Sequence, residues 1–284
     1  MIKLSGVVVL YEPDNEVVDN IKSYLKKLDK LYVIDNTPNK NNSCMIPKSK
    51  KIEYIPYFEN KGVSYALNDA AKRSISQGYN WMLTMDQDSS FMNNEISQML
   101  DYIDKNCDNK KIGLVSPWHV IDTNPEKPKE KIDYPVEVMT SGNIINLKAY
   151  KKIGGYKDWL FIDCIDFDYC MNLHSHNYDV VRLNYVEMKH HLGNICIKHC
   201  LRRDFVCSNH NFIRRYYMVR NTFYIVDIYK EIYPEYCSFL KRGLRGQLIN
   251  IILFEKDKYR KVRNMYRGYK DYKKRRKGVY PYEN

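Results

Sequence analysis

The segment Trp81–Ser89 reads WMLTMDQDS and joins a mainly apolar run to two closely spaced carboxylates. Trp81–Met85 has the pattern of a strand that is buried on both faces. Asp86 and Asp88 follow it, separated by a single residue. Two carboxylates this close repel each other, and a hard divalent cation between them would relieve the repulsion. Asp is also common in turns, so an ordinary surface turn stays open as the alternative.

Upstream of this segment, apolar β-branched runs alternate with amphipathic stretches. Gly6–Tyr11 (GVVVLY) is the clearest buried strand. The predicted strands are 6–11, 31–34, 52–56 and 81–85, and the predicted helices are 17–28 and 63–77. Strand–helix alternation of this kind predicts an α/β fold with a parallel sheet flanked by helices.

Polar clusters follow three of these predicted strands, namely Asp35, Asn60–Gly62 and Asp86–Asp88. In open α/β sheets, ligands bind outside the carboxyl ends of the strands. We therefore expect the three clusters to converge on one edge of the sheet. Asn60 offers both a donor and an acceptor, and Gly62 allows close approach of the backbone to a ligand, although an ordinary turn is the alternative here too.

The second half of the chain is less regular. Residues 112–116, 136–139 and 144–146 have strand patterns, and a charged loop from Asn124 to Lys131 separates the first two. We expect helices over 148–153 and 167–175, and a mostly helical chain from Phe212 onward.

The net charge of +12 is concentrated at one end of the chain. The last thirty residues hold twelve Lys/Arg and four Asp/Glu, so they carry eight of these charges. The near-neutral remainder argues against a nucleic-acid enzyme with a basic active face. The N-terminal segment lacks the pattern of a signal peptide, and no apolar run is long enough for a transmembrane helix. We therefore expect a cytoplasmic protein whose cysteines are reduced.

Many short strings, in order, resemble bacterial rhamnosyltransferase-like members of glycosyltransferase family 2. The resemblance covers roughly the first 225 residues. Its strings are VLYxP at 9–13, VIDN at 33–36, NKGVSxALN at 60–68, LTMDQDS at 83–89, SGN at 141–143, GGY at 154–156, FID at 161–163 and RYYxxRN at 215–221.

The resemblance implies a GT-A fold, which is a Rossmann-like mixed sheet flanked by helices. The implied domain spans residues 1–225, and a basic helical extension follows over 226–284. The implied reaction is an inverting transfer from a nucleotide-diphosphate sugar. Donor-binding residues would be Tyr11, Asp35, Asn60, Gly62, Asn68, Asp86 and Arg220, and acceptor-binding residues Gly142, Asn143 and Asp163.

The same resemblance implies that Asp86 and Asp88 hold Mg²⁺ or Mn²⁺ against the diphosphate, with His190 completing the metal shell or binding a phosphate. A pair of partly buried structural histidines is the alternative for His190 and His191. Cys196, Cys200, Cys207 and His210, with His199 among them, invite comparison with a zinc site. However, their spacing matches no compact zinc module, which favours idle thiols.

Inversion requires a general base that deprotonates the acceptor hydroxyl. In the family, a carboxylate pair just before a helix supplies this base, and Asp166 aligns best with it. This chain has Ile165 where many relatives have Glu, so Asp163 is the second candidate. Asp168 has the alternative role of a charge that the helix N-terminus favours.

The C-terminal segment interleaves Lys/Arg with tyrosines, which suits an anionic membrane interface. Because related enzymes extend lipid-linked glycans, the resemblance implies such an acceptor, a dTDP- or UDP-linked donor and docking to the inner face of the cell membrane. No nucleic-acid partner is expected. A solvated basic helix is the alternative for the tail. For the whole chain, the alternatives are a nucleotidyltransferase and a non-catalytic membrane or nucleic-acid adaptor.

Overall fold

The computed structural model describes residues 2–121, 126–190, 196–200 and 203–282. The chain divides into two compact units. The first comprises Met1–Tyr156 and Tyr169–His191, and the second comprises Lys157–Asp168 and Leu192–Asn284. The domain boundary expected at residue 225 stays a prediction.

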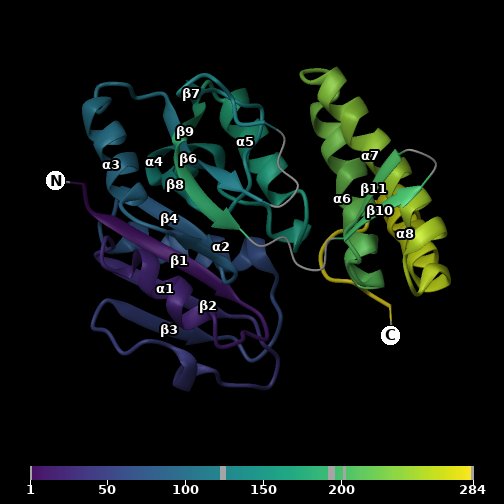
Figure 1. Cartoon of the computed structure of the whole chain (residues 1–284), viewed down its shortest axis with the longest axis horizontal. Coiled ribbons are helices and arrows are strands. Elements are labelled where there is room, and N and C mark those ends of the chain that lie inside the picture. The colour runs from purple at the N-terminus through teal and green to yellow at the C-terminus, as the bar shows by residue number, and fades with distance from the viewer. Residues whose placement is uncertain (1, 122–125, 191–195, 201–202, 283–284) are drawn as a thin grey trace. The chain divides into compact units, whose positions relative to one another are not determined.

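The first unit is built around one mixed sheet, whose labelled strands can be followed in Figure 1. The strand order is β3-β2-β1-β4-β8-β6-β9-β5, with β7 paired to β9. The strands are β1 (Leu4–Leu10), β2 (Lys30–Asp35), β3 (Ile52–Pro56), β4 (Trp81–Asp86), β5 (Ser89–Phe91), β6 (Ile112–Val120), β7 (Ile132–Asp133), β8 (Asn143–Asn146) and β9 (Asp179–His190).

Strands β1 to β4 are mutually parallel, as the strand–helix alternation predicted. Strand β8 runs antiparallel to both of its neighbours, β4 and β6, whereas β6 and β9 are parallel. The short strands β5 and β7 pair with β9 in the antiparallel sense. The expected mixed sheet flanked by helices is confirmed.

Helices cover both faces of this sheet. They are α1 (Val17–Leu25), α2 (Val63–Ser76), α3 (Glu95–Lys105), α4 (Leu147–Ile153) and α5 (Ile165–Ser175). Alternate β1 side chains, including Leu4 and Val8, join the core with α1 and α3. Between them, Ser5 points to the other face, where its hydroxyl donates to Ser74 of α2 at 2.8 Å.

One predicted strand is wrong. Residues 136–139 form no strand, because their backbone carbonyls pair with side chains instead of a neighbouring strand. The Met139 carbonyl accepts from the Asn143 amide at 2.8 Å, and the Val138 carbonyl lies 4.0 Å from the Cys170 thiol. In this region, the strand that pairs with the sheet is β7, which precedes Pro135 and pairs with β9.

The second unit contains the predicted C-terminal helices. They are α6 (Phe212–Tyr229), α7 (Pro234–Phe254) and α8 (Lys258–Lys273), and they accompany a hairpin of β10 (Cys196–Cys200) and β11 (Arg203–Cys207). Val219, Ile251 and Met265 form an apolar cluster between the helices. Within the described residues, no helix combines the length and hydropathy needed to cross a membrane.

Two features hold α6 and α8 together. Gly268 of α8 lies so close to α6 that a Cβ atom there would be 2.4 Å from the Tyr216 carbonyl oxygen. Glu255, which is fully buried, accepts from Arg215 of α6 at 2.7 Å and from Lys261 of α8 at 2.8 Å. A buried carboxylate with two cationic donors is satisfied, but the loss of one partner would leave an unpaired charge.

Gly268→Ala should lower the free energy of unfolding by about 2 kcal/mol, because the added methyl group collides with backbone. Gly246→Ala is the matched control, since a Cβ at this α7 position meets open space. Alanine has the higher helix propensity, so the control should gain about 0.5–1 kcal/mol. Denaturant unfolding measures both changes, and effects of equal sign would contradict the close packing of α6 and α8.

Candidate active site

The carboxyl ends of the parallel strands are brought level by their register. Leu10 at the end of β1 pairs with Asp35 at the end of β2, and Val9 pairs with Asp86 at the end of β4. The residues that follow these strands therefore start from one edge of the sheet, as the sequence predicted for Asp35 and Asp86.

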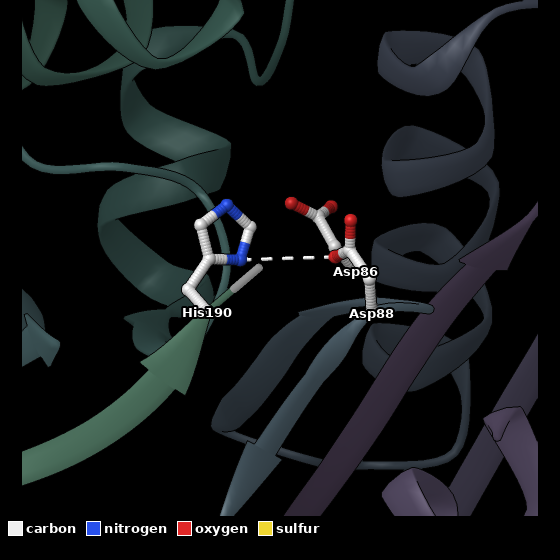
Figure 2. Close-up of side chains that lie close together, drawn as sticks. All are labelled: Asp86, Asp88 and His190. Atoms are coloured by element: carbon white, nitrogen blue, oxygen red, sulfur yellow. Dashed lines mark ion pairs between the residues drawn. The ribbon is translucent and has the colours of Figure 1, made fainter. Parts of the chain in front are cut away.

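Asp86, Asp88 and His190 form a cluster at this edge. Each offers one potential ligand atom, and these atoms all lie within 4.8 Å of one another. Figure 2 shows both carboxylates directed toward the imidazole ring. His190 Nδ1 lies 3.7 Å from Asp88 Oδ1 and 2.6 Å from the Ser89 hydroxyl oxygen.

Strand pairing explains how His190 reaches the two acids from a distant part of the sequence. Ser89, the first residue of β5, pairs with His190, the last residue of β9. His191, Leu192 and Gly193, which follow His190 and with it resemble an H-x-x-G segment of the family, lie outside the described residues.

Gln87, between the two acids, fixes their turn. Its side-chain amide accepts from the Tyr11 backbone N–H at 2.8 Å and donates to the Tyr11 carbonyl at 3.2 Å. The Asn20 amide donates to the Gln87 carbonyl at 2.8 Å. The acids therefore sit on a turn anchored to both β1 and α1, unlike a loose surface turn. The sequence reasoning did not identify Gln87.

A buried histidine is linked to the cluster through Ser141. His119 of β6 places Nε2 2.6 Å from the Ser141 carbonyl, which can only accept, so Nε2 carries the proton. The Ser141 hydroxyl in turn accepts from the Asp86 backbone N–H at 3.0 Å. Burial lowers the pKa of His119 to about 4, so this imidazole is neutral near pH 7. The sequence analysis did not predict a role for His119, although a histidine within a mainly apolar strand could have indicated one.

Asp35 is buried, and three groups donate to its carboxylate. Oδ1 accepts from the Thr37 backbone N–H at 2.9 Å. Oδ2 accepts from the Asn42 amide at 2.8 Å and from the Tyr54 hydroxyl at 2.7 Å. This network organises the loop after β2. Contact between Asp35 and a nucleoside stays a prediction.

Asn60 and Gly62 form the turn that leads into α2. The Asn60 side-chain oxygen accepts from the Gly62 backbone N–H at 3.0 Å, and Gly62 has a φ of 86°. Asn36 bridges back from the end of β2, since its amide donates to the Gly62 carbonyl at 3.2 Å. Tyr11, the residue after β1, has an exposed side chain. Of the seven predicted donor-binding residues, Asn60, Gly62 and Tyr11 thus lie beyond the carboxyl ends of parallel strands.

Asn68 and Arg220 have internal partners instead. The buried Asn68 amide donates to the Tyr156 carbonyl at 2.8 Å and accepts from the Tyr150 hydroxyl at 2.7 Å. Arg220 in the second unit is fully buried and donates to main-chain carbonyls, among them Trp159 at 2.8 Å. Both side chains therefore have a structural role here, and direct donor contact by them stays a prediction.

Gly142 and Asn143 are buried where β4 and β8 pair. The Gly142 backbone N–H donates to the Thr84 carbonyl at 2.7 Å, and its φ is +80°. A Cβ atom at Gly142 would lie 2.5 Å from the Met188 sulfur. The structure thus explains a glycine here by packing, and acceptor contact by either residue stays a prediction.

The three candidate bases all belong to the second unit and differ in their partners. Asp168 is buried and forms an ion pair with Lys157, and it accepts from the Tyr229 hydroxyl at 3.0 Å. Asp163 accepts from the Arg214 guanidinium at 3.0 Å. Burial raises the pKa of the Asp163 carboxyl, and Arg214 opposes this rise.

Asp166 lies in the first turn of α5, where its carboxylate accepts from the Phe167 backbone N–H at 3.0 Å. A helix N-terminus favours a negative charge. The role of Asp166 as the general base stays a prediction.

Within the described residues, Asp86, Asp88 and His190 are the only group of three or more His, Cys, Asp or Glu side chains placed closely enough to hold a metal ion. Cys196, Cys207 and His210 therefore form no such group, and the side chains of His199 and Cys200 lie outside the description.

Comparison with known proteins decides the family. The family model described as "Glycosyl transferase family 2" matches residues 7–156, which is more than half of the chain. The chain belongs to glycosyl transferase family 2.

Two individual proteins show how far this family likeness extends. The dTDP-rhamnosyl transferase RfbF of Shigella flexneri is 25% identical over 243 residues, covering 78% of this chain and 79% of RfbF. The crystal structure titled GalNAc-T7 with UDP, GalNAc and Mn2+ matches with a TM-score of 0.59 at 12% identity. That match covers 84% of this chain, which spans half of the GalNAc-T7 chain. It shows the shared glycosyltransferase fold.

In a family 2 glycosyltransferase, the ligand chemistry of the Asp86–Asp88–His190 cluster has a clear use. Carboxylate oxygens are the ligands that Mg²⁺ and Mn²⁺ prefer, and imidazole is a common additional ligand of transition metals. Asp88 is the most exposed member, whereas His190 is largely buried. The three side chains therefore have the ligand types of a divalent-cation site.

Stability should fall in mild acid because of His119. Its folded pKa of about 4 lies below the unfolded value of 6.5, so the unfolded state takes up a proton first as the pH drops. The group should thus remove about 2 kcal/mol of unfolding free energy between pH 7.5 and pH 5. Denaturant unfolding in EDTA would reveal a smaller pH dependence in His119→Gln. An unchanged dependence would contradict this assignment.

Proposed function

We propose that the chain is an inverting glycosyltransferase that moves a hexose from a nucleotide-diphosphate sugar to a glycan acceptor. The observation that carries the proposal is the Asp86–Asp88–His190 cluster at the carboxyl edge of a family 2 sheet. Rhamnose from a dTDP-linked donor is the first candidate, since RfbF is named for that reaction. A UDP-linked hexose is the second, because GalNAc-T7 was crystallised with UDP.

Asp86 and Asp88 would hold Mg²⁺ or Mn²⁺, and His190 would complete the shell. The donor set fits such an ion, since two carboxylates and an imidazole approach within 4.8 Å. When bound, the ion neutralises diphosphate charge and stabilises the departing nucleotide. Gln87 and His119 would keep the first acid in place through the contacts of its turn.

The donor would lie along the same edge of the sheet. We assign the nucleoside to the loops that Asp35 and Asn60–Gly62 organise, with the exposed Tyr11 ring beside them. Asn68 and Arg220 complete the predicted donor set, and their internal bonds support an indirect contribution.

Asp166 is our assignment for the general base. By resemblance to the family, the base is a carboxylate at the start of a helix, and Asp166, in the first turn of α5, aligns best with that position. Asp163, which pairs with Arg214, is the second candidate, and Asp168, which pairs with Lys157, has the alternative role of a charge near the helix N-terminus. We assign Asp163 to the acceptor site together with Gly142 and Asn143.

Family membership favours sugar transfer over nucleotidyl transfer and over a non-catalytic adaptor role. The GT-A domain would span residues 1–225, followed by a helical extension over 226–284. We further propose a lipid-linked acceptor for a bacterial surface polysaccharide and a cytoplasmic location at the inner face of the cell membrane.

One experiment separates donor binding from catalysis. Asp88→Asn should weaken Mn²⁺-dependent binding of dTDP and UDP at least roughly tenfold, because it removes an anionic ligand. Asp166→Asn should retain that binding and lower kcat roughly 10³-fold, because it removes the proton acceptor. Calorimetry gives the affinity, and release of the nucleoside diphosphate gives kcat.

Asp104→Asn, a change on the outside of α3, is the control for both measurements. Metal-independent nucleotide binding, or full turnover by Asp166→Asn, would overturn the corresponding assignment. An Asp163→Asn variant with the larger loss of kcat would transfer the role of base to that residue.

The membrane proposal rests on an exposed face of α7 more than on the tyrosines of α8. Four large apolar side chains of this helix, Phe239, Ile249, Ile252 and Leu253, are each between 49 and 57% exposed. Arg242 and Arg245 accompany them, and the helix has no acidic residue after its first turn. Apolar side chains beside cations suit the headgroup region of an anionic bilayer.

Part of the α8 sequence pattern has another explanation. Tyr272 donates to Asp227 at 2.7 Å, and its ring stacks on Phe223. Lys261 is buried against Glu255. Tyr259 and Tyr266 are the strongly exposed tyrosines of α8 and are the ones we assign to the membrane.

Ile249→Ser combined with Leu253→Ser should reduce binding to vesicles that contain phosphatidylglycerol roughly tenfold, because burial of these side chains contributes to membrane affinity. Vesicle co-sedimentation measures the change. Ile232→Ser, an equally exposed apolar residue outside α7, should bind as the wild type does. Equal binding by all variants would refute docking through α7.

A further inference from the structure

The loop that leads into α5 has an unusual backbone. Phe161 has a φ of +68°, and both Asp163 and Cys164 have a φ of +63°. Residues other than glycine avoid this left-handed region, because their Cβ atom crowds the carbonyl oxygen. Three such residues within four positions require surrounding contacts that hold them. The loop ends two residues before Asp166.

The side chain of Asn221 on α6 supplies these contacts. Its amide nitrogen lies 2.8 Å from the Leu160 carbonyl, 2.8 Å from the Ile162 carbonyl and 3.0 Å from the Asp163 carbonyl. Asn221 is fully buried, so no water competes for this group. One NH₂ group thus lies within hydrogen-bond distance of three loop carbonyls, which share its two N–H donors.

Arg220 orients this amide. Its Nε donates to the Asn221 side-chain oxygen at 3.0 Å, which directs the NH₂ group to the loop. The same guanidinium donates to the Trp159 carbonyl at 2.8 Å. The Arg220 guanidinium therefore connects the Asn221 side chain to the backbone just before the loop.

The same side of α6 makes two further contacts with the loop. Arg214 pairs with Asp163, and the Tyr217 ring stacks on Phe161 with centroids 4.9 Å apart. Arg214, Tyr217 and Asn221 are spaced by three and four residues, which places them on one face of the helix. This face touches each left-handed residue or a neighbouring carbonyl.

We propose that Asn221 is a positioning residue, which holds the left-handed loop so that the carboxylates following it are aimed for proton transfer. This inference rests on the proposed function, in which Asp163 and Asp166 serve the acceptor. In the loop, the side chain contacts backbone carbonyls alone, so it affects the reaction through loop geometry. Small misplacements of a catalytic group can cost large factors in rate.

The test compares Asn221→Ala and Asn221→Asp with the wild type. Aspartate keeps the shape and the acceptor for Arg220, but it presents an oxygen to three carbonyls. We expect both variants to lower kcat at least ~30-fold, while the KM for the donor changes less than about threefold. Hydrogen exchange should become at least ~10-fold faster at the amides of residues 160–168.

Asn264→Ala is the matched control. Asn264 is likewise buried in the second unit, and its amide donates to the Arg260 carbonyl at 2.9 Å without touching the loop. It should leave kcat and loop exchange unchanged. The stoichiometry of Mn²⁺-dependent nucleotide binding, expected to stay near one per chain, shows that the loss of kcat does not come from unfolded protein.

The outcomes separate this inference from the proposed function. Full turnover by Asn221→Asp in an active enzyme would overturn the positioning role alone. A loss of kcat without faster loop exchange would also overturn it. A wild-type protein that transfers no sugar would overturn the proposed function, and hydrogen exchange would still report whether Asn221 holds the loop.

Discussion

The parallel register of β1 with β2 and β4 is the constraint on which the candidate site depends. It places Asp35 and Asp86 at strand ends that are level with each other, so that each following loop begins at the same edge of the sheet. Two acids in one turn would repel each other without an anchor. The Gln87 bonds to Tyr11 and the antiparallel pairing of β5 with β9 provide one, and the latter also delivers His190.

Local patterns were sufficient to predict the elements around β1 to β4, because buried strands and amphipathic helices have recognisable hydrophobic patterns. The cluster of Asp86 with Asp88 was predictable for the same reason. The arrival of His190 was suggested only by family resemblance, since Ser89 and His190 are 101 residues apart and meet through a three-residue strand. His119 and Gln87 act through backbone partners, which leave no periodic trace in the sequence.

Residues selected by motif alone divide into two kinds. Asn60 and Gly62 form a turn at a strand end, where a ligand has access. Asn68 and Arg220 belong to equally distinctive strings, but their polar groups are consumed by internal carbonyls and hydroxyls. A string shows that residues occur together, whereas only the hydrogen-bond partners distinguish a ligand contact from the support of a loop. The predicted strand over Val136–Met139 was wrong for a related reason, because side chains hydrogen-bond to backbone groups that a strand would need.

The basic tail shows why net charge overstates free positive surface. Lys261 is buried with Glu255 and Arg215, and Arg276 pairs with the buried Asp271. These cations compensate acids inside the second unit, so they contribute less to the free positive surface than the net charge suggests. What remains for a membrane is a smaller set of exposed cations beside apolar side chains, and this combination is most complete on α7. Composition concentrates the charge in the last thirty residues, whereas burial centres the proposed membrane-facing residues on the helix before them.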